Sequence, residues 1–514
     1  MASIAYICIL LYVQIENQKK LRGKIMRQTI EIQLTFGKVD ISQIKTDPKS
    51  RDEIDKIVRG LQYIYTNNEI RTEVFKLLEA EIEPKVSKKT GRPGMELWKI
   101  LVLGVIKQGC SWDYDKLQNI ANNHLMIREL LGHDKYEWED RYYYELQTLK
   151  DNVQLLTPEL LYKINEIVVK AGHNLLGGKK KEELHCSTDS FVVKTDIHFP
   201  SDISLLNDSM RKAIKLTTDI CEDYKISGWR QSTYNIKSIK RELRRVQKSK
   251  HLGKSSSEEK VKAAHQEYIT KANNLLAKVK DSLAKLNQSL TADLILLARL
   301  MEIEKYIKYA EQQIDLIGRR VLRGEVIPHS EKLFSIFEPY TRWISKGKAG
   351  VYVEFGLPVS IMKDQHGYIL DWEVMENTND VDIPVKLTKR AKLKFPAIKS
   401  SSYDKGYWSP SNRQAMEGLV EKPVMPKKGR LNKIEKAEES SEEFIKLRKG
   451  HSSVESTING LDHCGLDKCY DHGLLGFKRC VGLSILSRNI QTLGKHIKEK
   501  EEKSKNRKRY KKAA

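Results

Sequence analysis

Three acidic residues occupy positions that suit metal-dependent chemistry. Asp189 lies inside residues 185–196, where β-branched residues interleave with small polar ones and predict a strand. Asp404 directly follows the short strand expected at Ile398–Tyr403, and Glu455 lies on an expected helix. Carboxylates placed in this way can converge on two hard divalent ions, and we expect Mg²⁺ or Mn²⁺. Two such ions would activate a nucleophile and stabilise the leaving oxygen of a phosphodiester displacement.

Other assignments of chemistry have less support. Each carboxylate taken alone also fits a structural role, as a turn cap, a loop residue before glycine or a surface charge. Asp196 and Asp202 lie close to Asp189, which is preferred because it sits within the strand, and Asp202 is kept as a supporting group. Histidine and cysteine residues gather at His463, Cys464, Cys469, His472 and Cys480. Their Cys-x4-Cys spacing is not typical of a zinc site, and no P-loop, G-x-S-x-G or H-E-x-x-H motif appears.

The chain carries a large excess of positive charge. Its 91 Lys and Arg residues against 68 Asp and Glu give a net charge of +23 over 514 residues. Such an excess favours a polyanionic partner, nucleic acid first and an anionic membrane second. The residues expected to contact DNA phosphates are Arg92, Lys405, Tyr407, Lys427, Lys428, Arg430 and Arg448.

The composition is that of a globular protein. Hydrophobic residues make up 40% of the chain and charged residues 31%, which argues against an integral membrane protein and against general disorder. The seven cysteines are widely spread, so we expect a reducing, cytoplasmic compartment rather than a secreted disulfide scaffold. Residues 1–25 are expected to be a leader of little relevance, with Met26 as an alternative start. The Lys-rich residues 494–514 are expected to form a basic, disordered tail.

Helical periodicity dominates residues 51–171, and we interpret residues 26–171 as a helical N-terminal DNA-binding region. A helix from about Met95 is followed by the turn Gln108–Ser111 and by short helices at Asp113–Ala121 and His124–Leu131. This order is typical of a helix-turn-helix, but a helical bundle without DNA contact has the same pattern. Both interpretations stay open.

Residues 185–493 alternate between strand and helix patterns. After the first strand come a hairpin of Val351–Met362 and Tyr368–Met375, then helix, strand, helix, strand and helix. This order predicts a mixed α/β fold with a ribonuclease-H-like catalytic core, interrupted by a helical insertion at 203–326. The insertion contains a predicted helical hairpin, Val261–Val321, and an earlier amphipathic helix. That earlier helix carries Arg241, Arg244 and Arg245, which form either a solvated face or a binding surface.

Several blocks of residues resemble DDE insertion-sequence transposases of the ISNCY kind. The first block is Thr188-Asp189-Ser190 with Val192-Val193 and Ile197–Asp202, and the lead into the next strand is Arg342-Trp343-Ile344 with Lys346-Gly347-Lys348. The second block is Asp404–Tyr407 with Ser409-Pro410 and Asn412-Arg413. The third is His451–Ser456 with Gly465–Asp467 and Phe477–Arg479.

The resemblance implies Mg²⁺-dependent DNA transposition with Asp189, Asp404 and Glu455 as the triad. It also implies binding to the element's own inverted repeats, transfer of 3′-OH ends to target DNA, and at least a homodimer in a nucleoid-associated complex. Many relatives carry Tyr-x2-Arg-x3-Glu-x6-Lys around the Glu, where this chain has Arg448, His451, Glu455 and Asp462. The alternatives are a catalytically inactive DNA-binding protein derived from a transposase, and a structural protein built on the helical hairpin.

Overall fold

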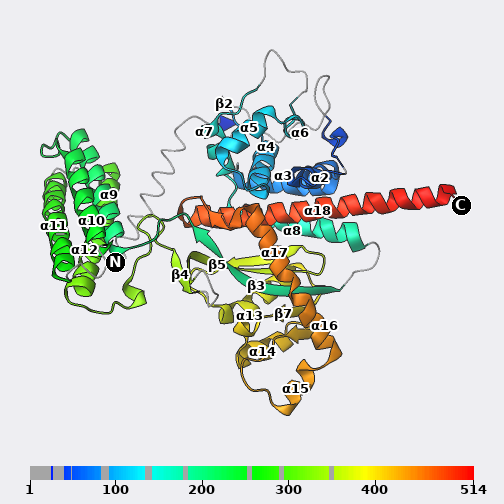
Figure 1. Cartoon of the computed structure of the whole chain (residues 1–514). Helices are drawn as coiled ribbons and strands as arrows, with labels where there is room; N and C mark the ends of the chain where they lie inside the picture. The colour runs from blue at the N-terminus through cyan, green and yellow to red at the C-terminus, as the bar shows by residue number, and fades with distance from the viewer. Residues whose placement is uncertain are drawn as a thin grey trace. The chain divides into compact units, whose positions relative to one another are not determined.

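The computed structural model describes residues 25–26, 40–47, 49–82, 92–133, 142–177, 183–251, 258–288, 294–345 and 352–513. They form two compact units, labelled by element in Figure 1. The larger unit combines residues between 23 and 196 with those from 344 onward, and the smaller unit contains 197–343. The expected leader lies outside the described residues except for Ile25, which belongs to the short strand β1 (Ile25–Met26), parallel to β2 (Arg92–Pro93).

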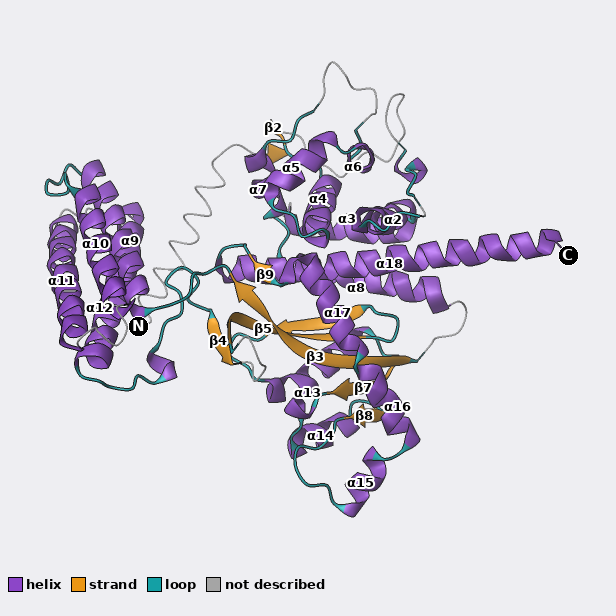
Figure 2. Cartoon of the chain, in the orientation of Figure 1, coloured by secondary structure: helices purple, strands orange, loops and turns teal. Residues whose placement is uncertain are grey.

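A mixed seven-stranded sheet is formed almost entirely by residues of the larger unit (Figure 2). Its longest strand, β3 (Leu184–Thr195), pairs antiparallel with β5 (Val353–Lys363) and parallel with β7 (Ile398–Tyr403). The other strands are β4 (Arg342–Ser345), β6 (Ile369–Val374), β8 (Lys422–Val424) and β9 (Lys468–Cys469). β6 is antiparallel to β5, while β8 is parallel to β7 and β9 is parallel to the end of β3. The predicted mixed α/β class is confirmed.

Helices pack against this sheet. α16 (Glu442–His451) contacts β3, β7 and β8, and α17 (Ser453–Leu461) contacts β3. α13 (Ile383–Lys394) contacts β6 and β7, and α14 (Pro410–Glu417) contacts β8. α15 (Lys433–Glu439) packs on α16. The two covering helices α16 and α17 therefore lie over the strand that carries Asp189.

The N-terminal helices share one hydrophobic core with α18 (Gly473–Ala513) and the sheet. They are α2 (Glu53–Thr66), α3 (Asn68–Ile82), α4 (Leu97–Gly109), α5 (Tyr114–Asn123), α6 (Leu125–Leu130), α7 (Leu146–Val153) and α8 (Pro158–Gly177). The helices of the expected helix-turn-helix correspond to α4, α5 and α6. Every residue of α4 except Lys99 and Lys107 is buried, so this helix serves packing. The N-terminal helices belong to the same compact unit as the sheet.

The predicted disordered tail is wrong for residues 494–513, which continue α18. Gly494 lies against the backbone of Lys56 on α2, and Arg59 pairs with Glu501 at 2.8 Å. Lys, Arg and Glu are good helix formers, so the charged sequence prolongs a helix that packing has already nucleated.

Among the described residues, no helix has both the length and the apolar character needed to cross a bilayer.

The crossing of α2 and α18 depends on glycine. A Cβ atom at Gly494 would lie 2.0 Å from the carbonyl oxygen of Lys56, which is backbone and has little room to move. We expect Gly494→Ala to lower the free energy of unfolding by about 1–3 kcal/mol, the usual cost of overpacking. Gly177→Ala at the end of α8 is the control, because its Cβ meets nothing within 4 Å. Urea unfolding of both variants tests this, and equal stabilities would show that the helices separate at no cost.

The smaller unit is a bundle with its own apolar core. Its helices are α9 (Asp202–Asp223), α10 (Ser232–His251), α11 (Glu258–Gln288) and α12 (Leu294–Ile317). Leu206 and Ile214 of α9, Ile239 of α10 and Ile303 of α12 are among its buried residues. The helical insertion expected at 203–326 lies within this unit, and α11 and α12 correspond to the expected hairpin.

Candidate metal centre

Two parallel strands bring Asp189 and Asp404 together. Thr188 of β3 is the register partner of Tyr403, the last residue of β7. Asp189 is the next residue of β3 and Asp404 directly follows β7, so they lie at the same level of the sheet. Neighbouring strands are about 4.8 Å apart, which places the two carboxyl groups within reach of one ion. Asp404 then begins the short 3₁₀ turn Lys405–Tyr407.

His451 completes the group from the end of α16. One oxygen of each aspartate and one ring nitrogen of His451 all lie within 4.8 Å of one another. The Nε2 atom of His451 is 3.3 Å from Oδ1 of Asp404. Ser441 caps the start of α16 by accepting a hydrogen bond from the backbone N–H of Phe444, which fixes the helix that delivers His451.

Ser402 orients the imidazole. Its hydroxyl lies 3.1 Å from Nδ1 of His451, and it also lies 3.2 Å from the carbonyl oxygen of Cys186. When the hydroxyl donates to this carbonyl, it accepts a hydrogen bond from Nδ1–H of His451. That tautomer leaves a lone pair on Nε2, on the side of the two aspartates.

The two aspartates have opposite pKa shifts. Burial raises the pKa of Asp189, and the nearby negative charge of Asp404 adds to this rise. When the imidazole of His451 carries a proton on Nε2, its hydrogen bond lowers the pKa of Asp404 below the ordinary value, and the positive charge of Arg448 contributes. The site therefore holds one carboxyl group that resists ionisation beside another that is stabilised as the anion.

These donor atoms fit a divalent cation. Two carboxylate oxygens and an imidazole nitrogen converge, and Nε2 of His451 is buried without a well-aligned hydrogen bond. A cation between them would relieve the repulsion between acceptor atoms. Carboxylates suit Mg²⁺ and Mn²⁺, while an imidazole nitrogen favours Mn²⁺ and the later transition metals over Mg²⁺.

Glu455, the third predicted ligand, is exposed on α17 and lies outside this group. It follows His451 by four residues, with Ser452 between α16 and α17 in a helical conformation. Residues four apart on a helix project on the same side, so Glu455 lies one turn beyond His451. Sequence reasoning missed His451 as a ligand, although its spacing of four residues before Glu455 was a usable signal.

The residues predicted to contact phosphates differ in their exposure to solvent. Lys405, Lys428, Arg430 and Arg448 are exposed, and the side chain of Arg92 lies outside the described residues. The prediction for Tyr407 is wrong, because its side chain is 2% exposed and packs against the Tyr403 ring at 5.6 Å between ring centroids. The 3₁₀ turn after Asp404 folds this ring inward, which an exposed-looking loop sequence does not reveal.

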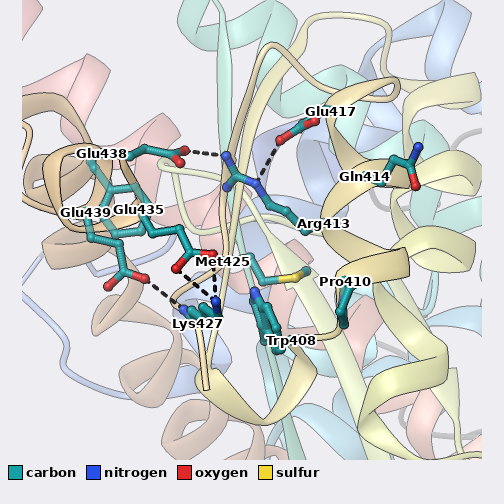
Figure 3. A pocket seen from close by; sticks show the side chains of 11 residues that line it. Trp408, Pro410, Arg413, Gln414, Glu417, Met425, Lys427, Glu435, Glu438 and Glu439 are labelled. Atoms are coloured by element: carbon teal, nitrogen blue, oxygen red, sulfur yellow. Dashed lines mark hydrogen bonds and ion pairs between the residues drawn. The ribbon is translucent and has the colours of Figure 1, made fainter. Parts of the chain in front are cut away.

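Lys427 lies in a cavity of about 420 Å³ rather than on an open loop (Figure 3). Its Nζ atom donates to both carboxylate oxygens of Glu435, at 2.7 and 2.9 Å. Arg413, on the same cavity, pairs with Glu417 and Glu438. Acidic side chains thus already neutralise both cations, which disfavours a phosphate at this place.

The remaining sequence candidates do not join the centre. Asp196 pairs with Lys468 at 2.6 Å and Asp202 pairs with Arg320 at 2.9 Å. The thiols of Cys464, Cys469 and Cys480 are buried. Within the part of the chain that is described, the group of Asp189, Asp404 and His451 is the one cluster with metal-binding geometry.

Comparison with known proteins identifies no relative of this chain. No protein-family model, no curated protein and no solved structure matches the chain. The interpretation of the site therefore depends on its own geometry and chemistry.

Proposed function

We propose that the chain is a DNA transposase that cleaves phosphodiesters and joins the resulting 3′-OH ends to target DNA. The observation that carries the proposal is the juxtaposition of Asp189 on β3 with Asp404, which directly follows β7, completed by His451. The strand order β6, β5, β3, β7, β8, with β7 and β8 parallel to β3, supports a ribonuclease-H-like core.

Each part of the site has a role in this chemistry. Asp189, Asp404 and His451 would hold a divalent ion, which supplies Lewis-acid activation and neutralises charge on the phosphate. Ser402 holds the imidazole in one orientation. Arg448 and Lys405 are exposed near Asp404 and would attract the DNA backbone. Glu455, one turn beyond His451, is the proposed ligand for a second ion.

The exposed position of Glu455 also favours a second candidate, a DNA-binding protein derived from a transposase that no longer cleaves. A centre without the third carboxylate would bind one ion but lack the second, on which two-ion displacement depends. Both candidates bind DNA, so binding does not distinguish them. Metal-dependent strand cleavage does, because only the active transposase carries it out.

The deciding experiment is strand scission of a plasmid that carries the DNA flanking the gene. We expect purified full-length protein to make nicks at defined flanking positions with Mg²⁺ or Mn²⁺ and none with EDTA. A plasmid of the same size without the flanking DNA is the control for sequence-independent cleavage. Tight binding to the flanks without nicks under any metal would overturn the transposase assignment in favour of the inactive binder.

A further inference from the structure

The strongest unassigned surface lies on α10 of the helical unit. Six of its basic residues are exposed: Lys237, Lys240, Arg241, Arg244, Arg245 and Lys248. At 100° per residue, all of these except Arg245 fall within an arc of about 100° on the helix. With a rise of about 1.5 Å per residue, these five side chains extend along about 16 Å of one face. We call these five residues the α10 stripe.

The stripe faces solvent because the opposite side of α10 is fixed in the bundle. Ile239 and Val246 are fully buried, Leu243 is nearly so, and all three belong to the apolar core of this unit. The helix packs against α9 and α11. The orientation of the stripe is therefore set by packing rather than by a mobile loop.

The stripe also lacks partners of opposite charge. No ion pair joins any of its five side chains to another residue in the described part of the chain. Arg245, just outside the stripe, differs because it pairs with Glu242 at 3.1 Å and Glu267 at 3.2 Å. Four other cations of the unit are each paired with a carboxylate: Lys262 with Glu258, Lys280 with Glu311, Lys285 with Asp281, and Arg299 with Asp223.

We propose that the α10 stripe binds the phosphate backbone of duplex DNA. Five unpaired cations in a row repel one another, and an extended polyanion relieves this repulsion while releasing condensed counterions. An anionic membrane fits less well, because a membrane-binding helix exposes apolar residues beside its cations. On α10 the apolar residues face the core, and Tyr234 is the large exposed exception among the described side chains.

This inference rests on the proposed function in taking DNA as the polyanion. The inference goes beyond the proposed function because it gives the helical unit a role in DNA contact that needs no base recognition. Phosphate contacts fix the position of a protein on the duplex without reading its sequence. The stripe should therefore add affinity equally for flanking DNA and for unrelated DNA.

The test compares two full-length variants that lose the same charge. In the stripe variant, Lys237→Gln, Lys240→Gln, Arg241→Gln and Arg244→Gln are combined. In the control, Lys262→Gln, Lys280→Gln, Lys285→Gln and Arg299→Gln remove four cations that are each paired with a carboxylate. All eight positions are on helices, where Gln is well tolerated. Dissociation constants for a mixed-sequence duplex are measured over a range of NaCl concentrations.

We expect the slope of log K against log [NaCl] to fall by up to about 3.6 in the stripe variant, about 0.9 for each lost phosphate contact. The control should keep the slope of the unaltered protein. Equal slopes for all three proteins would overturn the inference, as would stripe-dependent binding to phosphatidylserine vesicles without any effect on DNA. Plasmid scission distinguishes the two proposals: normal cleavage with an unchanged slope rejects only the stripe, and a reduced slope without cleavage rejects only the transposase.

Discussion

Asp189→Asn is expected to abolish metal-dependent strand cleavage, by about 10³-fold or more. Asp189 is one of two carboxylates in the centre, and an amide oxygen carries no charge to hold a divalent ion. A loss of 10³-fold corresponds to about 4 kcal/mol of transition-state stabilisation. Binding to flanking DNA should change little, because the centre contributes one ion among many phosphate contacts. Gel-based scission and DNA titration of the same preparation measure both quantities.

The same substitution should stabilise the folded protein without metal. Burial and Asp404 raise the pKa of Asp189 above its ordinary value of 3.8. A carboxyl group with a raised pKa contributes stability below its unfolded pKa and loses that contribution as the pH rises through the folded pKa. Asparagine does not titrate, so its side chain has no ionisation cost. The free energy of unfolding of Asp189→Asn should therefore exceed that of the unaltered protein above about pH 4, and the difference should persist at neutral pH. Thermal unfolding in EDTA at several pH values measures it.

Asp404→Asn is the matched control, because its pKa shift has the opposite sign. A carboxyl group with a lowered pKa contributes stability above its unfolded pKa and loses that stability as the pH falls through the folded pKa. Asp404→Asn should thus remove cleavage as Asp189→Asn does, but without stabilising the protein at neutral pH. Retained cleavage in either variant, or equal stabilisation by both, would contradict the assigned centre.

The sequence predicted the scaffold of the site well where patterning is local. The strand Ile398–Tyr403 has the predicted bounds and is buried along most of its length, and the helix expected around Glu455 is α17. Asp404 follows a buried strand, as predicted, and the parallel pairing of β7 with β3 brings it beside Asp189. These inferences need only periodicity and the geometry of neighbouring strands.

The parts that escaped prediction depend on contacts between distant segments. His451 becomes a ligand candidate because the fold brings its ring within 4.8 Å of the two aspartates, and Asp189 is far from it in the sequence. Tyr407 is buried because a 3₁₀ turn folds it onto Tyr403. Residues 494–513 look like a tail because their apolar residues are few, yet they extend a helix whose earlier turns are packed.

His451→Ala and Glu455→Ala should separate the two candidates for the third ligand. His451 lies with the two aspartates within 4.8 Å, whereas the triad predicted from the sequence has Glu455 in the third position. We expect His451→Ala to weaken Mn²⁺ binding by at least about 100-fold, because losing a direct donor costs no less than losing an outer-shell partner, which costs about 10–100-fold. Glu455→Ala should leave the affinity of this ion nearly unchanged and still abolish cleavage, since it removes the proposed second ion. His463→Ala, on an exposed histidine outside the cluster, is the control.

The metal preference provides an independent measure of the same assignment. An imidazole donor favours Mn²⁺ over Mg²⁺, so cleavage should saturate at a lower concentration of Mn²⁺. In His451→Ala only the oxygen donors remain. The concentrations of Mn²⁺ and Mg²⁺ at which cleavage saturates should therefore become more similar. If Glu455→Ala instead weakens Mn²⁺ binding while His451→Ala does not, the centre is formed by three carboxylates. In that case Glu455 turns inward when the ion binds, and His451 serves only to hold Asp404 in place.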